Sequence, residues 1–202
     1  MKVYGDIRSG NCYKIKLIMS LLDIQHEWID INILKGDNLS DAFKAKNPSG
    51  KIPVLELDDG RCLSESNAII NYLAAGSVYY PTERFLHAEV LQWQFFEQYS
   101  HEPYIAVARF IAKYLGMPEE RRDEFLSKQE GGHKALSLME QKLGNNDYLV
   151  NNQLTTADIA LFAYTHVADD GGFDLNQYPA IQRWIERIES QPKFYPMGSD
   201  PN

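Results

Sequence analysis

Residues 47–66 read NPSGKIPVLELDDGRCLSES, and the rest of the chain is organised around this stretch. Residues 52–57 have the apolar, partly β-branched character of a strand, Asp59-Gly60 favours a tight hairpin, and Cys62-Leu63 begins the return strand. Pro53 has no backbone donor, so it belongs at the entrance of a strand or on an edge, and its peptide bond is open to the cis form. The stretch therefore predicts a hairpin whose entrance leaves the backbone of the preceding residue free for a ligand.

A helix start follows the hairpin directly. Small polar residues occupy 64–67, and an apolar helical pattern at Ile69, Tyr72 and Leu73 comes next. The first backbone N–H groups of a helix have no partner inside the helix, and the helix dipole is positive at that end. This position suits an anion such as a carboxylate.

The first third of the chain alternates strand and helix signals. Residues 2–6 read as a strand, and an apolar helical pattern begins near Ser9. Residues 27–33 alternate as a second strand, and a short helix spans about 40–45. With the hairpin and a helix ending near Ala75, the order is β-α-β-α-β-β-α. We expect parallel pairing of the first two strands, an antiparallel hairpin, and a mixed four-stranded sheet with helices on both faces.

Beyond this region the strand signals disappear. We interpret residues 1–76 as an α/β domain, 77–83 as a linker and 84–202 as an all-helical domain. Thr155-Thr156-Ala157-Asp158 has the spacing of a capping box at a helix start, with aspartate in place of the commoner glutamate. We read Asp158 as a structural residue and not as a catalytic acid.

Composition excludes several functions. A formal net charge of −8 and a pI near 5.1 argue against nucleic acid or an anionic membrane as the main partner. No transmembrane run or signal peptide is visible, which predicts a cytoplasmic protein with Cys12 and Cys62 as free thiols. The cysteines and histidines lack the spacing of a zinc site, so we expect no metal.

Three motifs in this order resemble the cytosolic glutathione transferases: Ile52-Pro53-Val54, Ser64-Glu65-Ser66, and residues 155–159. The resemblance covers the whole chain. It implies a thioredoxin-like first domain, glutathione as co-substrate, a homodimer and a role in detoxification. Residues 4–12 and 35–43 are most similar to the theta class and its bacterial relatives, which implies a serine-type enzyme.

The resemblance also assigns the residues that bind glutathione. Ile52, beside a cis Pro53, would pair its backbone with the cysteinyl part, and Glu65 and Ser66 would hold the γ-glutamyl end. The chemistry agrees, because a carboxylate accepts from the γ-glutamyl ammonium, while a hydroxyl and a helix N-terminus receive the carboxylate. The alternative for residues 64–66 is an ordinary helix cap.

Two further residues, Lys51 and Asn38, fall where the family binds the glycyl carboxylate. Theta enzymes carry histidine at the position of Asn38, so this chain departs from the theta pattern there. Asn11 would add a donor beside the sulfur, a role similar to that in bacterial relatives that reduce disulfides.

Ser9 occupies the catalytic position of the family. An unperturbed thiol has a pKa near 8.5, and lowering this by about 2 units requires roughly 2.7 kcal/mol. A hydroxyl donor together with a helix N-terminus is of that order. Three alternatives stay open: Tyr4 as the donor, Cys12 as a thiol that forms a mixed disulfide, and Ser9 as a plain helix cap.

The resemblance implies an electrophile pocket between the two domains, with these candidates: Ile7, His101, Tyr104, Ala108 and Phe110. The alternative for the histidine is a solvent-exposed side chain, and Pro103 should kink its helix. The leading function is attack of the glutathione thiolate on a hydrophobic electrophile or a peroxide. The alternatives are glutathione-dependent disulfide reduction and a non-catalytic interaction module.

Overall fold

The computed structural model describes residues 1–199 of the 202-residue chain, and its contacts divide them into two compact units. The first unit is Met1–Ala75 together with the tail that begins at Gln191, and the second is Gly76–Ser190. Among the described residues, no helix is long and apolar enough to cross a membrane.

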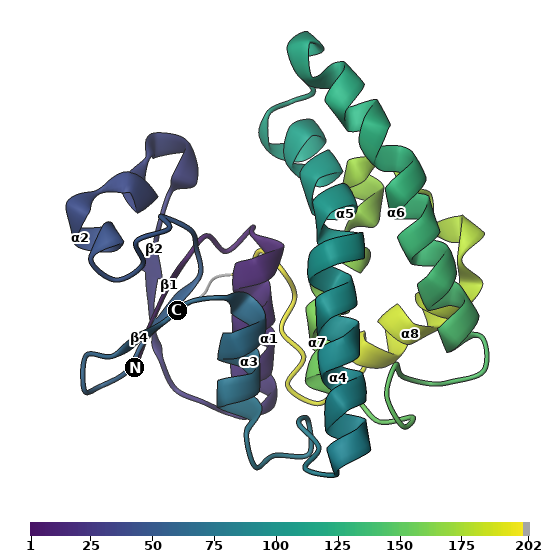
Figure 1. Ribbon diagram of the computed structural model, residues 1–202, viewed down its shortest axis with the longest axis horizontal. Helices are drawn as coiled ribbons and strands as arrows, with labels where there is room; N and C mark the ends of the chain where they lie inside the picture. The colour runs from purple at the N-terminus through teal and green to yellow at the C-terminus, as the bar shows by residue number, and fades with distance from the viewer. Residues whose placement is uncertain (200–202) are drawn as a thin grey trace. The chain divides into compact units, whose positions relative to one another are not determined.

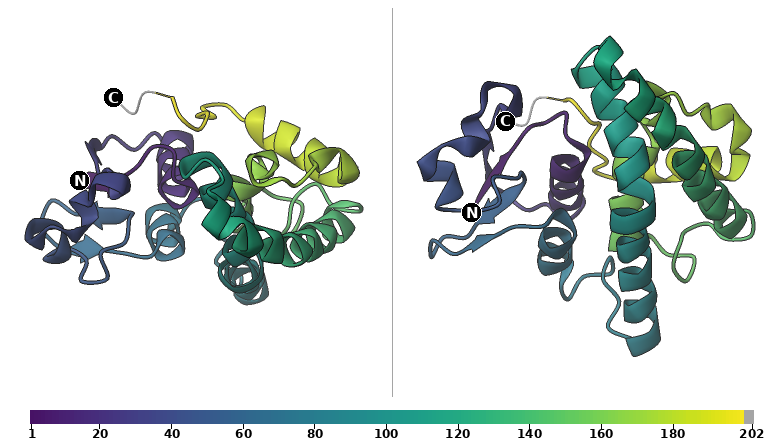
Figure 2. Two further views of the ribbon diagram at one scale, coloured as in Figure 1. Left: turned by 90° about the horizontal axis from the view of Figure 1, so that it is seen from above. Right: turned by 45° about the horizontal axis from the view of Figure 1, so that its top comes forward.

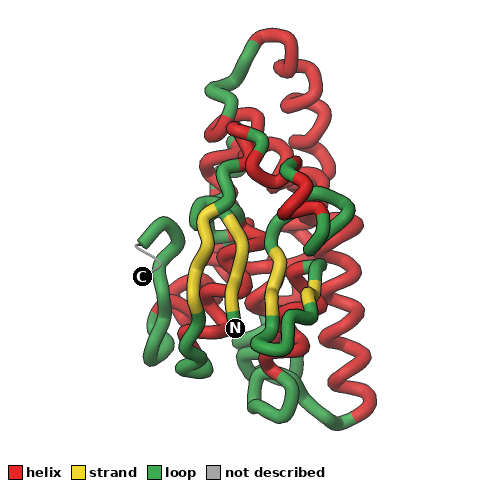
Figure 3. The backbone as a smooth tube through the Cα atoms, turned by 90° about the vertical axis from the view of Figure 1, so that its left-hand side faces the viewer, coloured by secondary structure: helices red, strands yellow, loops and turns green. Residues whose placement is uncertain are grey.

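A mixed four-stranded sheet forms the centre of the first unit (Figure 3). Its strands, in the spatial order β2-β1-β3-β4, are β2 (Glu27–Asp30), β1 (Lys2–Gly5), β3 (Val54–Glu56) and β4 (Cys62–Leu63). The first two strands pair in parallel and the other two pairings are antiparallel. The predicted strand order and directions are confirmed.

Helices cover both faces of this sheet (Figure 1). The helices α1 (Gly10–Leu21) and α3 (Ser66–Ala74) contact each other on one face, and the short helix α2 (Asp41–Lys44) lies on the other. Successive residues of β1 point to opposite faces. Val3 is fully buried, while the Tyr4 ring meets the Phe43 ring of α2 edge-on at 6.5 Å. The predicted α/β fold is confirmed.

The second strand is shorter than predicted. It ends at Asp30, and the chain continues as two 3₁₀ turns, η1 (Ile33–Lys35) and η2 (Asp37–Leu39). The Asn32 side chain accepts a hydrogen bond from the Lys35 amide at 3.1 Å, and Asp37 accepts from the Asn32 amide at 2.9 Å. These local bonds use backbone groups that a longer strand would need for pairing, so the predicted strand boundary near residue 33 was wrong.

The second unit is built from helices, as predicted (Figure 2). Its α-helices are α4 (Arg84–Phe96), α5 (Glu102–Arg109), α6 (Arg122–Leu143), α7 (Thr156–Thr165) and α8 (Pro179–Glu189). Every residue of α7 is buried, and α7 contacts both α4 and α5. A helix that is buried on all sides is the expected centre of such a bundle.

Two π-helical turns continue the helices of this unit, η3 (Glu97–His101) after α4 and η4 (Phe110–Tyr114) after α5. Pro103 lies in the first turn of α5, where its missing N–H interrupts no intrahelical bond. The irregularity that we expected at this proline therefore takes the form of a π-helical turn just before it.

The predicted capping box at the start of α7 is confirmed. Asp158 is fully buried, and its carboxylate accepts from the Thr155 amide at 2.9 Å and from the Leu149 amide at 2.9 Å. The indole of Trp184 in α8 donates to the same carboxylate at 3.0 Å. Burial raises the pKa of Asp158 to about 6, and the hydrogen bonds act against this rise. Asp158 thus joins α7, α8 and the loop before α7.

The tail after α8 belongs to the first unit and not to the helical one. The Tyr13 hydroxyl of α1 donates to the Tyr195 carbonyl at 2.7 Å, and the Ser20 hydroxyl donates to the Lys193 carbonyl at 2.7 Å. The Lys193 ammonium also pairs with Asp23 at 2.8 Å. The expectation that residues 84–202 form one helical domain therefore does not hold for the tail, because its carbonyls are bound by side chains of α1 and its lysine by Asp23.

Candidate active site

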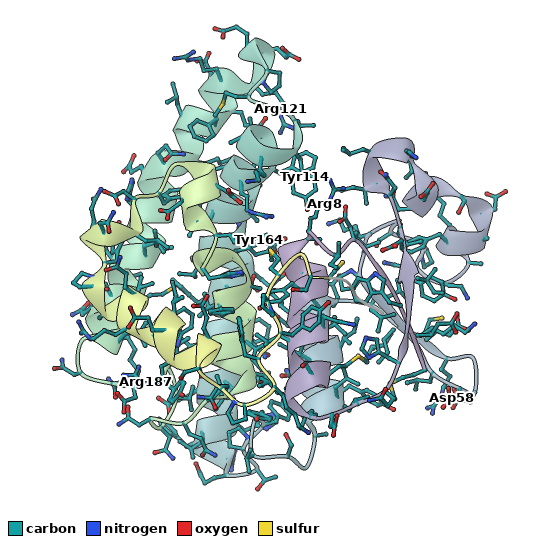
Figure 4. All side chains as sticks on the ribbon, turned by 180° about the vertical axis from the view of Figure 1, so that it is seen from behind. Arg8, Asp58, Tyr114, Arg121, Tyr164 and Arg187 are labelled. Atoms are coloured by element: carbon teal, nitrogen blue, oxygen red, sulfur yellow. The ribbon has the colours of Figure 1, made fainter. Side chains whose placement is uncertain are left out.

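The loop before α1 is held in a fixed turn. The buried Asp6 carboxylate accepts from the Arg8 amide at 2.9 Å and from the Arg8 guanidinium at 2.9 and 3.1 Å. Arg8 lies at the N-terminal end of α1 (Figure 4). The Ser9 amide donates to the Asp6 carbonyl at 2.9 Å, and Ser9 is the N-cap residue of α1 without a capping hydrogen bond from its side chain. The Ser9 hydroxyl therefore does not cap the backbone of the helix.

The neighbouring Cys12 is a buried thiol. Burial raises its pKa to about 12, although a hydrogen bond with the Ser9 side chain acts in the opposite direction. Cys12 packs close to Gly5 of β1, where a Cβ atom would lie 2.8 Å from the Cys12 sulfur. A thiol with this pKa stays protonated throughout the physiological pH range, so it is a poor nucleophile.

This environment predicts a clear difference between the two cysteines. Alkylation of the native protein with iodoacetamide between pH 6 and 9 should modify the exposed Cys62 and leave Cys12 unmodified. Peptide mass spectrometry measures the label on each residue, and alkylation in denaturant is the control in which both should react. Modification of Cys12 in the native protein at a rate similar to Cys62 would contradict its assignment as an inert thiol.

The alternative donor, Tyr4, is engaged elsewhere. Its hydroxyl donates to the Glu56 carboxylate at 2.8 Å, and the Lys46 ammonium binds the same carboxylate and lies over the Tyr4 ring, 4.9 Å from its centroid. Burial and the bond to Glu56 raise the pKa of Tyr4. These contacts keep the phenol on the face of the sheet that α2 covers.

The start of α3 has an unusual backbone. Glu65, its N-cap residue, has φ 67° and ψ 109°, and its side chain is exposed. A positive φ is uncommon for any residue other than glycine and is often found at functional sites. This conformation places an exposed carboxylate directly before the free N–H groups of the first turn of α3.

Side chains link the starts of α1 and α3. The Ser66 side chain is only 5% exposed, and its hydroxyl donates to the Asn11 amide oxygen at 3.1 Å. The fully buried Lys14 ammonium donates to the Ser66 hydroxyl at 3.2 Å and to the Asn67 amide oxygen at 3.3 Å. Two helix N-termini therefore lie side by side, which gives a site with donors for two separate negative charges.

The loop before β3 lies at the end of the sheet. The Ile52–Pro53 peptide bond is cis, and pairing of β3 with β1 ends at Val54, so Ile52 lies outside the ladder. The side-chain amide of Asn47 donates to the Lys51 carbonyl at 2.7 Å, and the side-chain amide of Asn38 donates to the Gly50 carbonyl at 2.7 Å. The Asn38 amide oxygen is buried without a partner, while the Lys51 side chain is exposed. Asn38 thus fixes the loop that carries Lys51.

Comparison with known proteins identifies the family. Residues 3–77 match the family described as Glutathione S-transferase, N-terminal domain, and residues 104–192 match Glutathione S-transferase, C-terminal domain. The crystal structure of a glutathione S-transferase from Pseudomonas fluorescens is 62% identical, has a TM-score of 0.97, and matches over 98% of both chains. The chain belongs to the glutathione S-transferase family.

Two other relatives of this transferase are more distant. A possible glutathione S-transferase from Rhodopseudomonas palustris is 45% identical with a TM-score of 0.95, over 99% of this chain and 90% of that one. The maleylacetoacetate isomerase of Pseudomonas aeruginosa is 25% identical over 96% of this chain and 93% of its own length. The resemblance inferred from the sequence is confirmed at the level of the family, and the chain is a glutathione transferase.

The residues expected to form the electrophile pocket of the transferase have different environments. His101 is fully buried, with its Nε2 atom 2.9 Å from the Thr165 hydroxyl, so the alternative of a solvent-exposed histidine was wrong. Ala108 is also fully buried. The other three, Ile7, Tyr104 and Phe110, are partly exposed. Their role in binding an electrophile stays a prediction.

Sequence reasoning missed one residue of the candidate site, Lys14, which bonds Ser66 and Asn67. It lies in a run of α1 that is otherwise largely apolar, between Tyr13 and Ile15, and all three side chains are buried. A lysine is rarely fully buried unless it has partners. A charged residue in an apolar run of a helix was therefore the signal that could have found Lys14. Within the described residues there is no group of three or more histidine, cysteine, aspartate or glutamate side chains that could hold a metal ion.

Proposed function

We propose that this protein is a serine-type, theta-like transferase in which the two adjoining helix starts bind and activate glutathione. One observation carries the proposal: the hydrogen bonds of Ser66 to Asn11 and Lys14 bring the N-terminus of α3 next to that of α1. One helix start then receives the γ-glutamyl carboxylate, and the other faces the thiol.

The γ-glutamyl end is bound at α3. The exposed Glu65 carboxylate accepts from the γ-glutamyl ammonium, and the first N–H groups of α3, beginning with the backbone N–H of Ser66, donate to the γ-glutamyl carboxylate. The backbone of Ile52 lies beyond the end of the ladder, so its N–H and C=O groups are placed to pair with the cysteinyl residue. Lys51 is the exposed cation for the glycyl carboxylate, and Asn11 is the second donor beside the sulfur.

The thiol is activated at α1. Ser9 donates its hydroxyl to the glutathione sulfur, and the N-terminus of α1 adds its partial positive charge, so the thiolate is favoured over the thiol. The thiolate then forms a bond to the electrophilic atom of the second substrate, and the leaving group departs with the electron pair. Ser9 stabilises the anion and takes up no proton.

The binding half of this proposal predicts a specific defect in the variant Glu65→Gln. Loss of the carboxylate removes a charge-assisted hydrogen bond, so we expect the Kd for glutathione to rise about tenfold while kcat at saturation changes by less than about threefold. Calorimetry and steady-state kinetics measure the two quantities. Glu27→Gln, at an exposed glutamate on β2, is the matched control and should bind like the wild type. Wild-type affinity in Glu65→Gln would exclude this binding mode.

The environment of Cys12 disfavours the form of disulfide reduction that would use this thiol. A disulfide-reducing role for Cys12 needs an accessible thiolate, but this thiol is buried and its pKa is raised to about 12. Parallel assays with an aryl halide, an organic hydroperoxide and a mixed disulfide of glutathione rank the reactions. Dominant activity on the mixed disulfide would replace this proposal with the reductase alternative.

We also propose that the transferase is a homodimer that uses the outer face of α4. An exposed stripe runs along α4 and η3 at helical spacing and carries three aromatic side chains: Phe85, Phe95 and Tyr99, which are 68%, 69% and 85% exposed. Aromatic residues gathered on one exposed helix face are typical of an association surface.

This dimer face predicts a monomeric variant. Phe95→Glu places a charge in the centre of the stripe, so sedimentation velocity should show a monomer where the wild type sediments as a dimer. Leu126→Glu, at a leucine of α6 that is 56% exposed, is the matched control and should remain dimeric. A wild-type monomer, or a dimeric Phe95→Glu variant, would exclude this surface. The cytoplasmic location expected from the sequence stays a prediction.

A further inference from the structure

A cavity of about 490 Å³ lies in the first unit, between the second half of α1, the segment before β2 and the C-terminal tail. Figure 3 shows the tail beside the sheet. The cavity is lined by none of the residues assigned above to glutathione. Its size is within the range of small-molecule sites in proteins.

A buried ammonium group forms part of the cavity wall. Lys16 is only 8% exposed, and its Nζ atom lies 3.2 Å from His26 Nε2. The Nδ1 atom of His26 lies 3.0 Å from the Ile24 carbonyl, which fixes the tautomer with the proton on Nδ1 and a lone pair on Nε2 toward the lysine. Burial together with Lys16 lowers the pKa of His26, so the imidazole is neutral and adds no second charge.

Aromatic rings flank the same ammonium group. Its nitrogen lies 5.0 Å from the centroid of the Tyr195 ring and 5.7 Å from that of Trp28. These distances are those of cation–π contacts. Tyr195 is a lining residue of the cavity, and its backbone carbonyl is held by the Tyr13 hydroxyl. The cavity thus presents a cationic donor next to the aromatic ring of Tyr195.

The charged residues that line the cavity favour an anion. They are two lysines and one aspartate, and the aspartate, Asp23, is already paired with Lys193 at 2.8 Å. Apolar atoms of Met19 and Ile24 complete the wall. A ligand with one acidic group and a flat apolar body matches both parts of this lining.

We propose that this cavity is a second ligand site, separate from the glutathione site, for small planar organic acids. The acidic group of the ligand accepts a charge-assisted hydrogen bond from Lys16, and its ring lies against Tyr195. The Asp23–Lys193 pair and Ser20, which binds the tail, line the same cavity.

Two probes of the same shape test the role of charge. Calorimetric titration of the wild type, with glutathione present, should show 2-naphthoate binding at least tenfold more tightly than the neutral 2-naphthamide. Equal affinities for the two probes would overturn the proposal. A second titration without glutathione is the comparison. Naphthoate binding that is seen without glutathione and lost with it would place naphthoate in the glutathione site, and this would also overturn the proposal. The titration gives an answer even if the proposed glutathione chemistry fails, because it is read without turnover.

Variants locate the binding. Lys16→Gln should remove the preference for naphthoate over naphthamide, while Lys44→Gln, at an exposed lysine outside the cavity, should keep it. Tyr195→Ala should weaken both probes at least fivefold, because it removes the ring and keeps the backbone carbonyl that binds Tyr13. Circular dichroism checks that each variant is folded. If Lys16→Gln does not fold, Tyr195→Ala alone tests the proposal. Wild-type binding in the folded variants would overturn the proposal.

Discussion

Replacement of Ser9 by alanine should lower kcat for aryl-halide conjugation at pH 7 by about 10- to 100-fold. A hydrogen bond to a charged group contributes about 1.5–3 kcal/mol, and each 1.36 kcal/mol is a factor of ten in rate. Because Ser9 is proposed to act on the thiolate alone, the Kd for glutathione should change only a few fold. The pKa of the bound thiol should rise by 1 to 2 units, so activity should recover at alkaline pH.

Two measurements separate this effect from a structural one. The ultraviolet absorbance of the bound thiolate against pH gives its pKa directly in the wild type and in Ser9→Ala. Ser9→Thr keeps a hydroxyl at the N-cap position and should restore most of the turnover. Unchanged turnover and an unchanged thiol pKa in Ser9→Ala would remove Ser9 from the mechanism.

The second large effect concerns stability. Replacement of Asp158 by alanine should lower the free energy of unfolding by about 3–5 kcal/mol, because it leaves buried donors at Leu149, Thr155 and Trp184 without an acceptor. For a chain of this length, we expect the melting temperature to fall by about 10 °C. Chemical and thermal denaturation measure both quantities.

Asp174→Ala is the matched control for this variant. Asp174 also accepts a backbone bond at a helix start, from the Asn176 amide at 3.0 Å, but its side chain is exposed. Water can therefore bind the N–H groups that the substitution leaves without an acceptor, and we expect the free energy of unfolding to fall by less than about 1 kcal/mol. A loss of similar size in both variants would contradict the view that burial makes Asp158 important.

Local sequence signals predicted much of the fold. The hairpin around Asp59-Gly60, the helix start at Ser66 and the capping box at Asp158 depend on a few neighbouring residues, and all three are present. Their chemistry is short-range, because it consists of residues that favour a turn and of side chains that accept hydrogen bonds from helix N–H groups. The helix start at residues 64–66 and the capping box also belong to the motifs that carried the resemblance to the family.

Contacts between distant segments could not be predicted in this way. The bond of the Tyr4 phenol to Glu56 depends on the register between β1 and β3, which no local pattern specifies. The positive φ of Glu65 depends on the packing that surrounds the start of α3. Burial of Lys14 and His101 likewise depends on which helices meet, and single-sequence periodicity does not give this.

The return of the tail makes the glutathione-binding unit discontinuous along the chain. Residues 1–75 leave the ribosome first, and the whole helical unit is made before Lys193 and Tyr195 can reach Ser20 and Tyr13. During synthesis the first unit therefore exists without the part of the cavity wall beside α1 that Lys193 and Tyr195 form. Its assembly is completed only by a segment that is translated after the helical unit.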